Sequence, residues 1–298
     1  ISYISNNLQE HENNKELYVD LTKIYHEAFP NDFLAYSVYA NSVLLNNYDQ
    51  GIDLLKEGCK LFDLSNTRYL YMDLMSAYMQ NNKIEDFNAL YDELIKEKIY
   101  IPQAFLIKAS TLFQNGELSQ AEKVLQKGIS SCSNDKNSSP SNISQMYGFL
   151  GDLYQSEKQN DKALQMYEKA FETDRTNIAL FNNYAYYLAL ADKDLEFALQ
   201  LIMTANSQTQ YSDPNMLDTE AYILYKLGRY NTAKEIQQKA IDLSQLPTAT
   251  LFDHMGDIEK ALNNTEAALD NWQKALTKAD ESQKEGIKNK IDHTKNTK

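Results

Sequence analysis

Residues that mark several protein classes are scarce in this chain of 298 residues. It has two cysteines, nine glycines, five prolines and one tryptophan, and no apolar run long enough to cross a membrane. Cys59 and Cys132 cannot build a disulfide framework or a zinc site by themselves. Glycine-rich turns and alternating β-branched stretches are nearly absent, which argues against a β-sheet protein. An all-α fold is therefore expected.

Basic residues are also in the minority. The chain has 29 Lys and Arg against 42 Asp and Glu, which gives a net charge of −13. Proteins that bind nucleic acid need a cluster of positive charge for the phosphates, and anionic membrane surfaces attract basic segments. We therefore expect no nucleic-acid partner and no binding to an anionic membrane surface. The lack of a long apolar run separately predicts that this chain has no transmembrane segment. The acidity itself is typical of a soluble protein.

No arrangement of residues typical of catalysis is present. The sequence lacks a Gly-rich phosphate loop, a G-x-S-x-G nucleophile motif, an H-E-x-x-H helix and a C-x-x-C pair. The histidines are scattered without metal-ligand spacing: His11, His26, His254 and His293. His254 and Asp257 share a helix face but have no nucleophile marked beside them. We expect no enzyme activity, no cofactor and no metal site.

What the chain does have is a period of 35 residues. Eight alanines follow it in two series: Ala163, Ala198, Ala233 and Ala268, and seven residues later Ala170, Ala205, Ala240 and Ala275. A period of this length indicates stacked helical repeats, and small residues let two helices approach closely. Replacing Ala233 by leucine should separate the helices and cost about 1–3 kcal/mol, whereas the same change at the outward-facing Lys234 should be nearly neutral.

The clearest unit spans residues 144–177. Its first helix carries Tyr147, Leu150, Gly151 and Tyr154, and its second carries Ala163, Tyr167 and Ala170. This pattern resembles the tetratricopeptide repeat (TPR), W-x₂-L-G-x₂-Y followed by A-x₃-F and a further small residue. The resemblance implies a right-handed α-solenoid of helix-turn-helix pairs. We count seven pairs, a leading half-repeat and a C-terminal capping helix.

The repeats differ in regularity along the chain. Ala121 and Ala163 are 42 residues apart, and the excess falls in the Ser- and Asn-rich stretch Ser130–Asn142. The first half also has bulky residues, such as Phe87, where small ones are usual. We predict a degenerate array at 1–130, a loop or hinge at 131–142, a regular array at 143–280 and a capping helix with tail at 281–298. A long surface loop is the alternative to a hinge.

Several helix starts can be predicted from capping residues. Asp213 followed by Pro214 places a carboxylate at the N-cap and a proline at the first helical position. Ser119 and Ser282 are each followed three residues later by glutamate, which predicts two capping boxes.

The resemblance also implies where a partner binds. In TPR proteins the first helices line a concave groove that holds a peptide segment. Projected onto this chain, the groove residues are Tyr69, Met72, Met79, Phe113, Asn182, Tyr186, Tyr222, Tyr225 and Asp257. Surface Tyr and Met are adaptable contact residues typical of protein recognition. The alternative is that these side chains only pack against the next repeat.

Within this set we expect Tyr186, Tyr222 and Tyr225 to dock the partner and Asn182 to hold its backbone. Asp218, Asp253 and Asp257 lie nearby in the same frame, which favours a partner with Lys or Arg. The expected function is therefore that of a non-catalytic scaffold for a protein or peptide partner.

The stretch from Asn177 to Thr277 is similar to TPR proteins of the bacterial cell envelope, with a Bacteroidetes-like richness in Asn, Lys and Tyr. The chain begins at Ile1 and not at Met, which fits a removed leader and a lipid anchor upstream. We expect a periplasmic or outer-membrane-associated protein, with a cytoplasmic location as the alternative. The alternative functions are a TPR-like ligand-binding lipoprotein for glycan or nutrient uptake and a regulatory arm of an enzyme.

Overall fold

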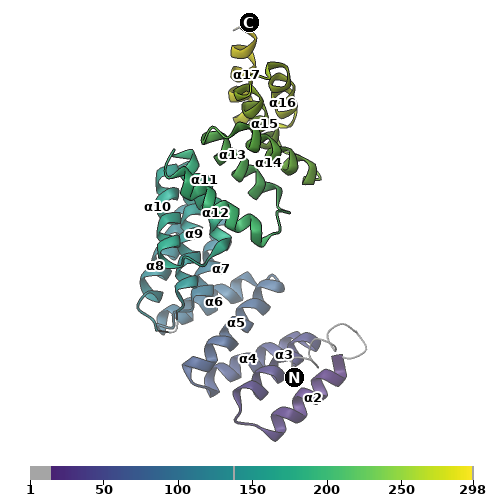
Figure 1. The fold of residues 1–298 in the computed structure, drawn as a ribbon. Helices are drawn as coiled ribbons and strands as arrows, with labels where there is room; N and C mark the ends of the chain where they lie inside the picture. Colours follow the sequence, from purple (N-terminus) through teal and green to yellow (C-terminus); the bar gives the residue numbers. More distant parts are fainter. Residues whose placement is uncertain (1–14, 137, 297–298) are drawn as a thin grey trace. The chain divides into compact units, whose positions relative to one another are not determined.

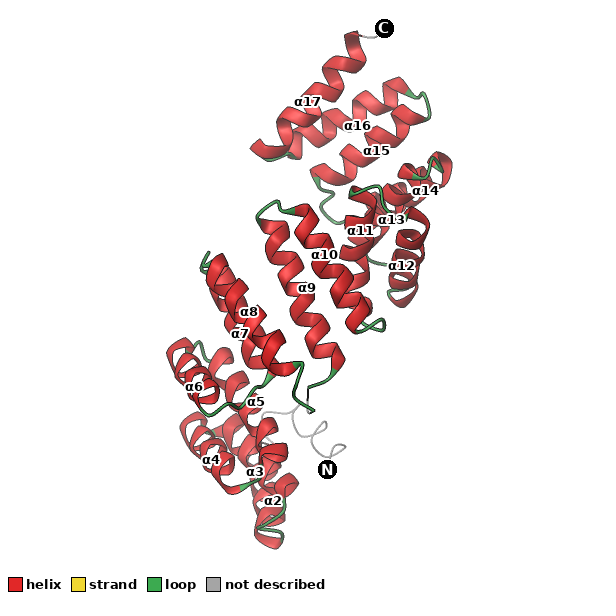
Figure 2. Cartoon of the chain, turned by 90° about the vertical axis from the view of Figure 1, so that its left-hand side faces the viewer, coloured by secondary structure: helices red, strands yellow, loops and turns green. Residues whose placement is uncertain are grey.

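The computed structural model describes residues 15–136 and 138–296, and in these residues every regular element is helical (Figures 1 and 2). A 3₁₀ turn, η2 (Ile178–Leu180), precedes α11. The α-helices are α2 (Lys15–Ala28), α3 (Phe33–Asn46), α4 (Tyr48–Leu61), α5 (Leu64–Gln80), α6 (Ile84–Lys96), α7 (Pro102–Gln114), α8 (Leu118–Cys132), α9 (Pro140–Ser156), α10 (Asn160–Thr173), α11 (Phe181–Leu190), α12 (Leu195–Gln208), α13 (Pro214–Lys226), α14 (Tyr230–Leu243), α15 (Ala249–Ala261), α16 (Thr265–Lys278) and α17 (Glu281–Asn296).

The chain divides into two compact units, residues 1–142 (unit 1) and 143–298 (unit 2). Within each unit, sequence neighbours pack against each other, and first helices also contact the first helix of the next pair, as α3 does α5 and α11 does α13. This is the packing expected of stacked helical repeats. The described residues contain the predicted seven pairs, α3/α4 to α15/α16, with α2 before them and α17 after them. The predicted fold class is confirmed.

The small residues of the repeat frame lie where helices meet. All eight alanines of the 35-residue series are completely buried. A Cβ atom built on Gly151 would lie 2.6 Å from the ring of Tyr167, and one on Gly256 would lie 2.4 Å from the ring of Trp272. Only glycine lets the first helix of these pairs pack against an aromatic ring of the second.

The helix starts confirm one of the capping predictions and contradict two. Asp213 accepts hydrogen bonds from the backbone N–H groups of Asn215 (2.8 Å) and Met216 (3.4 Å), as predicted. Helix α8 already begins at Leu118, so Ser119 lies inside it. At α17 the carboxylate of Asp280 accepts from the N–H of Gln283 at 3.0 Å. Asp280 is therefore the capping residue, and Ser282 donates its hydroxyl to it at 2.7 Å.

The irregular segment between the arrays is shorter than the predicted 131–142. Helix α8 continues to Cys132, whose side chain is fully buried, and α9 begins at Pro140, a favoured residue at the first helical position. Asp135 forms an ion pair of 2.5 Å with Arg68 of α5, which also donates to the carbonyl oxygen of Tyr100 at 3.0 Å. The segment is thus attached to unit 1, and its role as a hinge stays a prediction.

Helix α17 closes the array of unit 2 as a cap. Its buried residues are Ile287, Ile291 and Thr294, and the two isoleucines pack with Ala268, Trp272 and Ala275. The rest of the helix is mostly polar, so α17 covers the apolar surface of α16 and presents its other side to water.

Candidate partner-binding site

The predicted groove residues of unit 1 lie on its first helices α5 and α7. Tyr69 is 60% exposed and its ring centroid lies 6.2 Å from that of Phe33. Met72, Met79 and Phe113 are half-buried. Of these residues, Met79 lines a pocket.

That pocket lies between α5 and α7 and has a volume of about 320 Å³. It is formed by two apolar residues and a surrounding set of uncharged polar residues: Met79, Ile107, Ser76, Gln80, Ser110, Thr111 and Gln114. A pocket with this lining can accept an apolar side chain and hydrogen-bond the backbone on either side of it.

In unit 2 the first helices present a line of rings. The centroid of Tyr186 on α11 lies 5.8 Å from that of Tyr222 on α13, and Tyr222 stacks on His254 of α15 at 4.9 Å with an interplanar angle of 21°. We call Tyr186, Tyr222 and His254 the aromatic strip. Tyr186 and Tyr222 are half-buried and the His254 side chain is only 13% exposed, because these rings already pack on the neighbouring repeat. Packing against the next repeat is thus observed for these side chains, and partner recognition by them stays a prediction.

The remaining predicted residues flank the strip. Tyr225 contacts Tyr230, with 5.8 Å between ring centroids, and lines a small recess with Tyr222, His254 and Asp257. Asn182 donates to the side-chain oxygen of Asn183 at 3.2 Å. The Oδ1 atom of Asn182 is buried and has no hydrogen-bond partner among the described residues.

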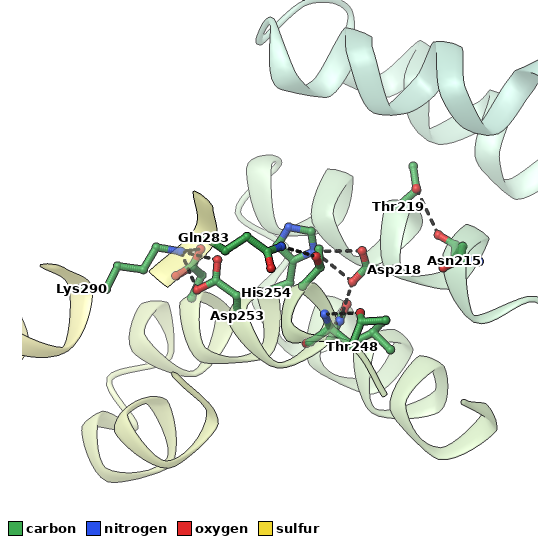
Figure 3. Close-up of polar contacts among 12 residues, drawn as sticks. Asn215, Asp218, Thr219, Thr248, Asp253, His254, Gln283 and Lys290 are labelled. Carbon is green, nitrogen blue, oxygen red and sulfur yellow. Dashed lines mark hydrogen bonds and ion pairs between the residues drawn. The ribbon is translucent and has the colours of Figure 1, made fainter. Parts of the chain in front are cut away.

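His254 was not among the predicted groove residues, and it forms the best-connected contact of the strip. Its Nδ1 lies 2.9 Å and 3.0 Å from the two carboxylate oxygens of Asp218, which also accepts from Gln237 Nε2 at 2.6 Å (Figure 3). Burial alone would lower the pKa of His254, but the contact with Asp218 outweighs it and the net pKa is raised. Protonated His254 is thus paired with Asp218.

A second charged group joins α15 and α17. Lys290 of α17 places Nζ 2.9 Å from both oxygens of Asp253 and 2.8 Å from Asp257 (Figure 3). Burial would lower the pKa of Lys290, but the two carboxylates raise it, so the lysine stays positively charged. The acidic residues expected to attract a partner are therefore largely compensated within the chain. Asp218, Asp253 and Asp257 face His254 and Lys290, which leaves a net charge of −1 when His254 is protonated.

Asp257 has a further structural role that is repeated elsewhere in unit 2. It accepts a hydrogen bond of 3.1 Å from Trp272 Nε1. Asp152 accepts one of 2.5 Å from the hydroxyl of Tyr167. Asp257 and Trp272 lie 105 residues, or three periods of 35, after Asp152 and Tyr167. In these two repeats the aspartate satisfies a polar group of the large aromatic residue of the second helix.

In the two repeats between these, the first-helix position of Asp152 and Asp257 is occupied by Tyr186 and Tyr222. There the second helix carries Ile202, which has no polar group, or Gln237, which bonds to Asp218 and to the carbonyl oxygen of Leu251 at 2.9 Å. These second-helix residues need no aspartate acceptor at the first-helix position. That position therefore carries a ring of the aromatic strip.

A comparison with known protein families agrees with this packing pattern. Residues 144–177 and 215–245, which cover α9/α10 and α13/α14, match the family model for the tetratricopeptide repeat. These two helix pairs are thus identified as tetratricopeptide repeats. TPR proteins are generally non-catalytic scaffolds that bind protein or peptide partners, and this chain has the fold of such a scaffold.

Several solved structures are similar to this chain. YrrB, described as a TPR protein with an unusual peptide-binding site, is 20% identical over 67% of this chain and 97% of its own, with a TM-score of 0.50. BtubC from P. vanneervenii is 16% identical over 66% and 89%, with a TM-score of 0.51. A TPR protein from Parabacteroides merdae is 18% identical over 86% and 98%, with a TM-score of 0.46. No curated protein matches the sequence.

Two searches of the described residues bear on other kinds of site. Within residues 15–136 and 138–296, no group of three or more His, Cys, Asp or Glu side chains is arranged to hold a metal ion. No helix in the same ranges combines the length and the apolar character of a membrane span.

Proposed function

We propose that this TPR protein is a non-catalytic scaffold that holds an extended segment of a protein partner along the aromatic strip of unit 2. The observation that supports this proposal is the contact of Tyr186, Tyr222 and His254 across three successive first helices. Rings aligned in this way offer apolar area in one continuous direction, which is what an extended chain needs. The peptide-binding site of YrrB, a protein of the same fold, is consistent with it.

The groups around the strip suggest how the partner is held. Covering a tyrosine ring removes apolar surface from water and contributes about 1.5–3 kcal/mol for a fully buried side chain. Tyr222 and Tyr225 are half-buried and gain a part of this when covered. Asn182 is the residue that we expect to hold the partner's backbone, and its buried Oδ1 must turn outward to accept a backbone N–H.

We further propose that the partner segment carries Lys or Arg. Two cations of the chain, protonated His254 and Lys290, face three carboxylates, so a net negative charge remains beside the strip. Such a charge mainly increases the association rate, and this increase weakens with salt. The effect is smaller than three free aspartates would produce.

The test uses partner captured from native lysate with the full chain and then purified. Its dissociation constant is measured for the wild type, for the Tyr222→Ala/Tyr225→Ala double variant, and for Tyr69→Ala, a single change of the same kind on a first helix of unit 1. We expect the double variant to weaken binding at least about tenfold and Tyr69→Ala to leave it unchanged. If only Tyr69→Ala weakens binding, the groove of unit 1 is the site and the proposal is wrong.

The location that we propose is the bacterial cell envelope, periplasmic or at the outer membrane. It rests on the similarity of Asn177–Thr277 to envelope TPR proteins. Cell fractionation with an antibody against this chain tests it, and recovery in the cytoplasmic fraction alone would contradict it.

A further inference from the structure

A cleft of about 270 Å³ lies in unit 1 between the second helices α4 and α6, with α5 beneath it. It is separate from the first-helix surfaces discussed above, because its walls come from second helices. In an array of close-packed repeats such a gap needs an explanation.

Three large side chains explain why the cleft exists. Tyr78 and Tyr91 correspond to Tyr154 and Tyr167 of the repeat at 144–177, each 76 residues later. The same offset places Met75, Phe87 and Leu94 where that repeat has one glycine and two alanines. These three residues are at most 2% exposed, so they fill the contact between α5 and α6. Large residues there hold α6 away from α5, and the outer layer opens between α6 and α4.

The floor of the cleft is apolar and aromatic. Tyr71, Leu74 and Tyr78 rise from α5, and Leu90 comes from α6. The half-buried thiol of Cys59 completes it. Burial, together with the nearby carboxylates of Glu93 and Asp73, raises the pKa of Cys59 to about 12. The thiol is therefore neutral at physiological pH, and this floor suits an uncharged side chain.

The two sides of the cleft carry opposite charges. Lys56 and Lys60 stand on α4, and Asp86 and Glu93 stand on α6. All four residues are exposed. In the part of the chain that the structure describes, no ion pair joins the lysines to these acids, and Lys56 instead lies 5.9 Å from the ring centroid of Tyr78. The cleft thus keeps a positive and a negative side apart over an apolar floor.

We propose that this cleft binds a small zwitterion, a free α-amino acid with an apolar or aromatic side chain. The side chain lies on the tyrosine floor, the carboxylate faces Lys56 and Lys60, and the ammonium group faces Asp86 and Glu93. The volume is near the lower limit for ligand pockets, so it suits one molecule of this size and not a peptide. The two lysines and the two acidic residues have a net charge of zero. The cleft is therefore not expected to prefer a ligand that is only anionic or only cationic.

Calorimetric titration of the full chain with four compounds tests the recognition of both charges. L-phenylalanine carries both, 3-phenylpropionate only the carboxylate, 2-phenylethylamine only the ammonium, and N-acetyl-L-phenylalanine amide neither. We expect L-phenylalanine to bind and the other three to bind at least about tenfold more weakly. Glycine, which lacks the side chain, should also bind weakly.

Variants on the two sides locate the site. Lys60→Gln should weaken binding of L-phenylalanine and 3-phenylpropionate, and Glu93→Gln that of L-phenylalanine and 2-phenylethylamine. Lys96→Gln, an exposed change on α6 outside the cleft lining, is the matched control. All three changes are on exposed side chains, so circular dichroism should show an intact fold. Absence of L-phenylalanine binding at millimolar concentration, equal binding of the neutral amide, or equal effects of all three variants would each overturn the proposal.

Discussion

Gly256 offers the sharpest test of the close helix contacts in unit 2. Its neighbours in the fold leave no room for a methyl group, since an added Cβ would lie 2.4 Å from both Cδ1 and Nε1 of Trp272. The indole is 3% exposed and is held by its hydrogen bond to Asp257. Gly256→Ala must therefore push the ring out of place or separate α15 from α16.

Three contributions set the size of the effect. Alanine is favoured over glycine inside a helix by about 1 kcal/mol. Overpacking a filled contact costs about 1–3 kcal/mol, and weakening the Trp272–Asp257 hydrogen bond costs about another 1 kcal/mol. The net expectation is a loss of about 1–3 kcal/mol in the free energy of unfolding.

The matched control is Gly286→Ala in α17. A Cβ at Gly286 meets nothing within 4 Å, so only the helix preference remains and the variant should gain up to about 1 kcal/mol. Urea unfolding can be followed by fluorescence, because Trp272 is the only tryptophan of the chain and reports on the contact itself. The two glycine variants should shift the unfolding midpoint in opposite directions.

One result would refute the reasoning. If Gly256→Ala stabilised the protein as Gly286→Ala does, and the emission of native Trp272 stayed unchanged, α15 and α16 could not be packed as closely as described.

Three further predictions follow from other contacts. Because the pKa of His254 is raised by Asp218, this pair stabilises the fold below the usual histidine pKa of about 6.5, and the contribution disappears as pH rises through the folded pKa; thermal melts should show this loss in the wild type and not in His254→Gln. Arg68→Ala removes the ion pair with Asp135, so limited trypsin digestion should cut first, and faster than in the wild type, within residues 133–139; first cleavage inside 177–277 would contradict this. Ala233→Leu should lower stability by about 1–3 kcal/mol in the same melts, with the exposed Glu235→Leu nearly neutral and an unchanged Ala233→Leu as the contrary result.

Glu235 replaces the control that the sequence suggested. Lys234 was expected to point outward and to tolerate leucine. Its Nζ lies 2.9 Å from the carboxylate of Glu259, whose side chain is only 7% exposed. Removing the lysine would leave a buried carboxylate without its charge partner, so Lys234→Leu is expected to be destabilising and not neutral.

The repeat frame could be predicted from the sequence because it depends on local spacing. The fixed period of the alanine series predicts which face of each helix is buried, and all eight alanines of the series are buried. The positions of Tyr186 and Tyr222 on neighbouring first helices follow from the same frame. His254 does not, because it lies 32 residues after Tyr222, outside the period, and reaches its ring only through side-chain direction.

Contacts between helices that are far apart along the chain could not be predicted from the sequence. Nothing in the spacing shows that Lys290 of α17 reaches Asp253 and Asp257, since that depends on how α17 packs after α16. The cleft above α5 has a signal in the sequence, the bulky Phe87 and Leu94. Whether large residues there fill a gap or open one is decided by three-dimensional packing.

The aspartate pairs of unit 2 have a consequence for how this surface can change. Asp152 and Asp257 each satisfy an aromatic partner in the second helix, so a substitution there requires a compensating change fifteen residues later, at Tyr167 or Trp272. At the equivalent positions Tyr186 and Tyr222, a substitution requires no compensating change in the second helix. Recognition can therefore diverge by single mutations in the two middle repeats, while the outer repeats evolve only by coupled pairs and preserve the framework.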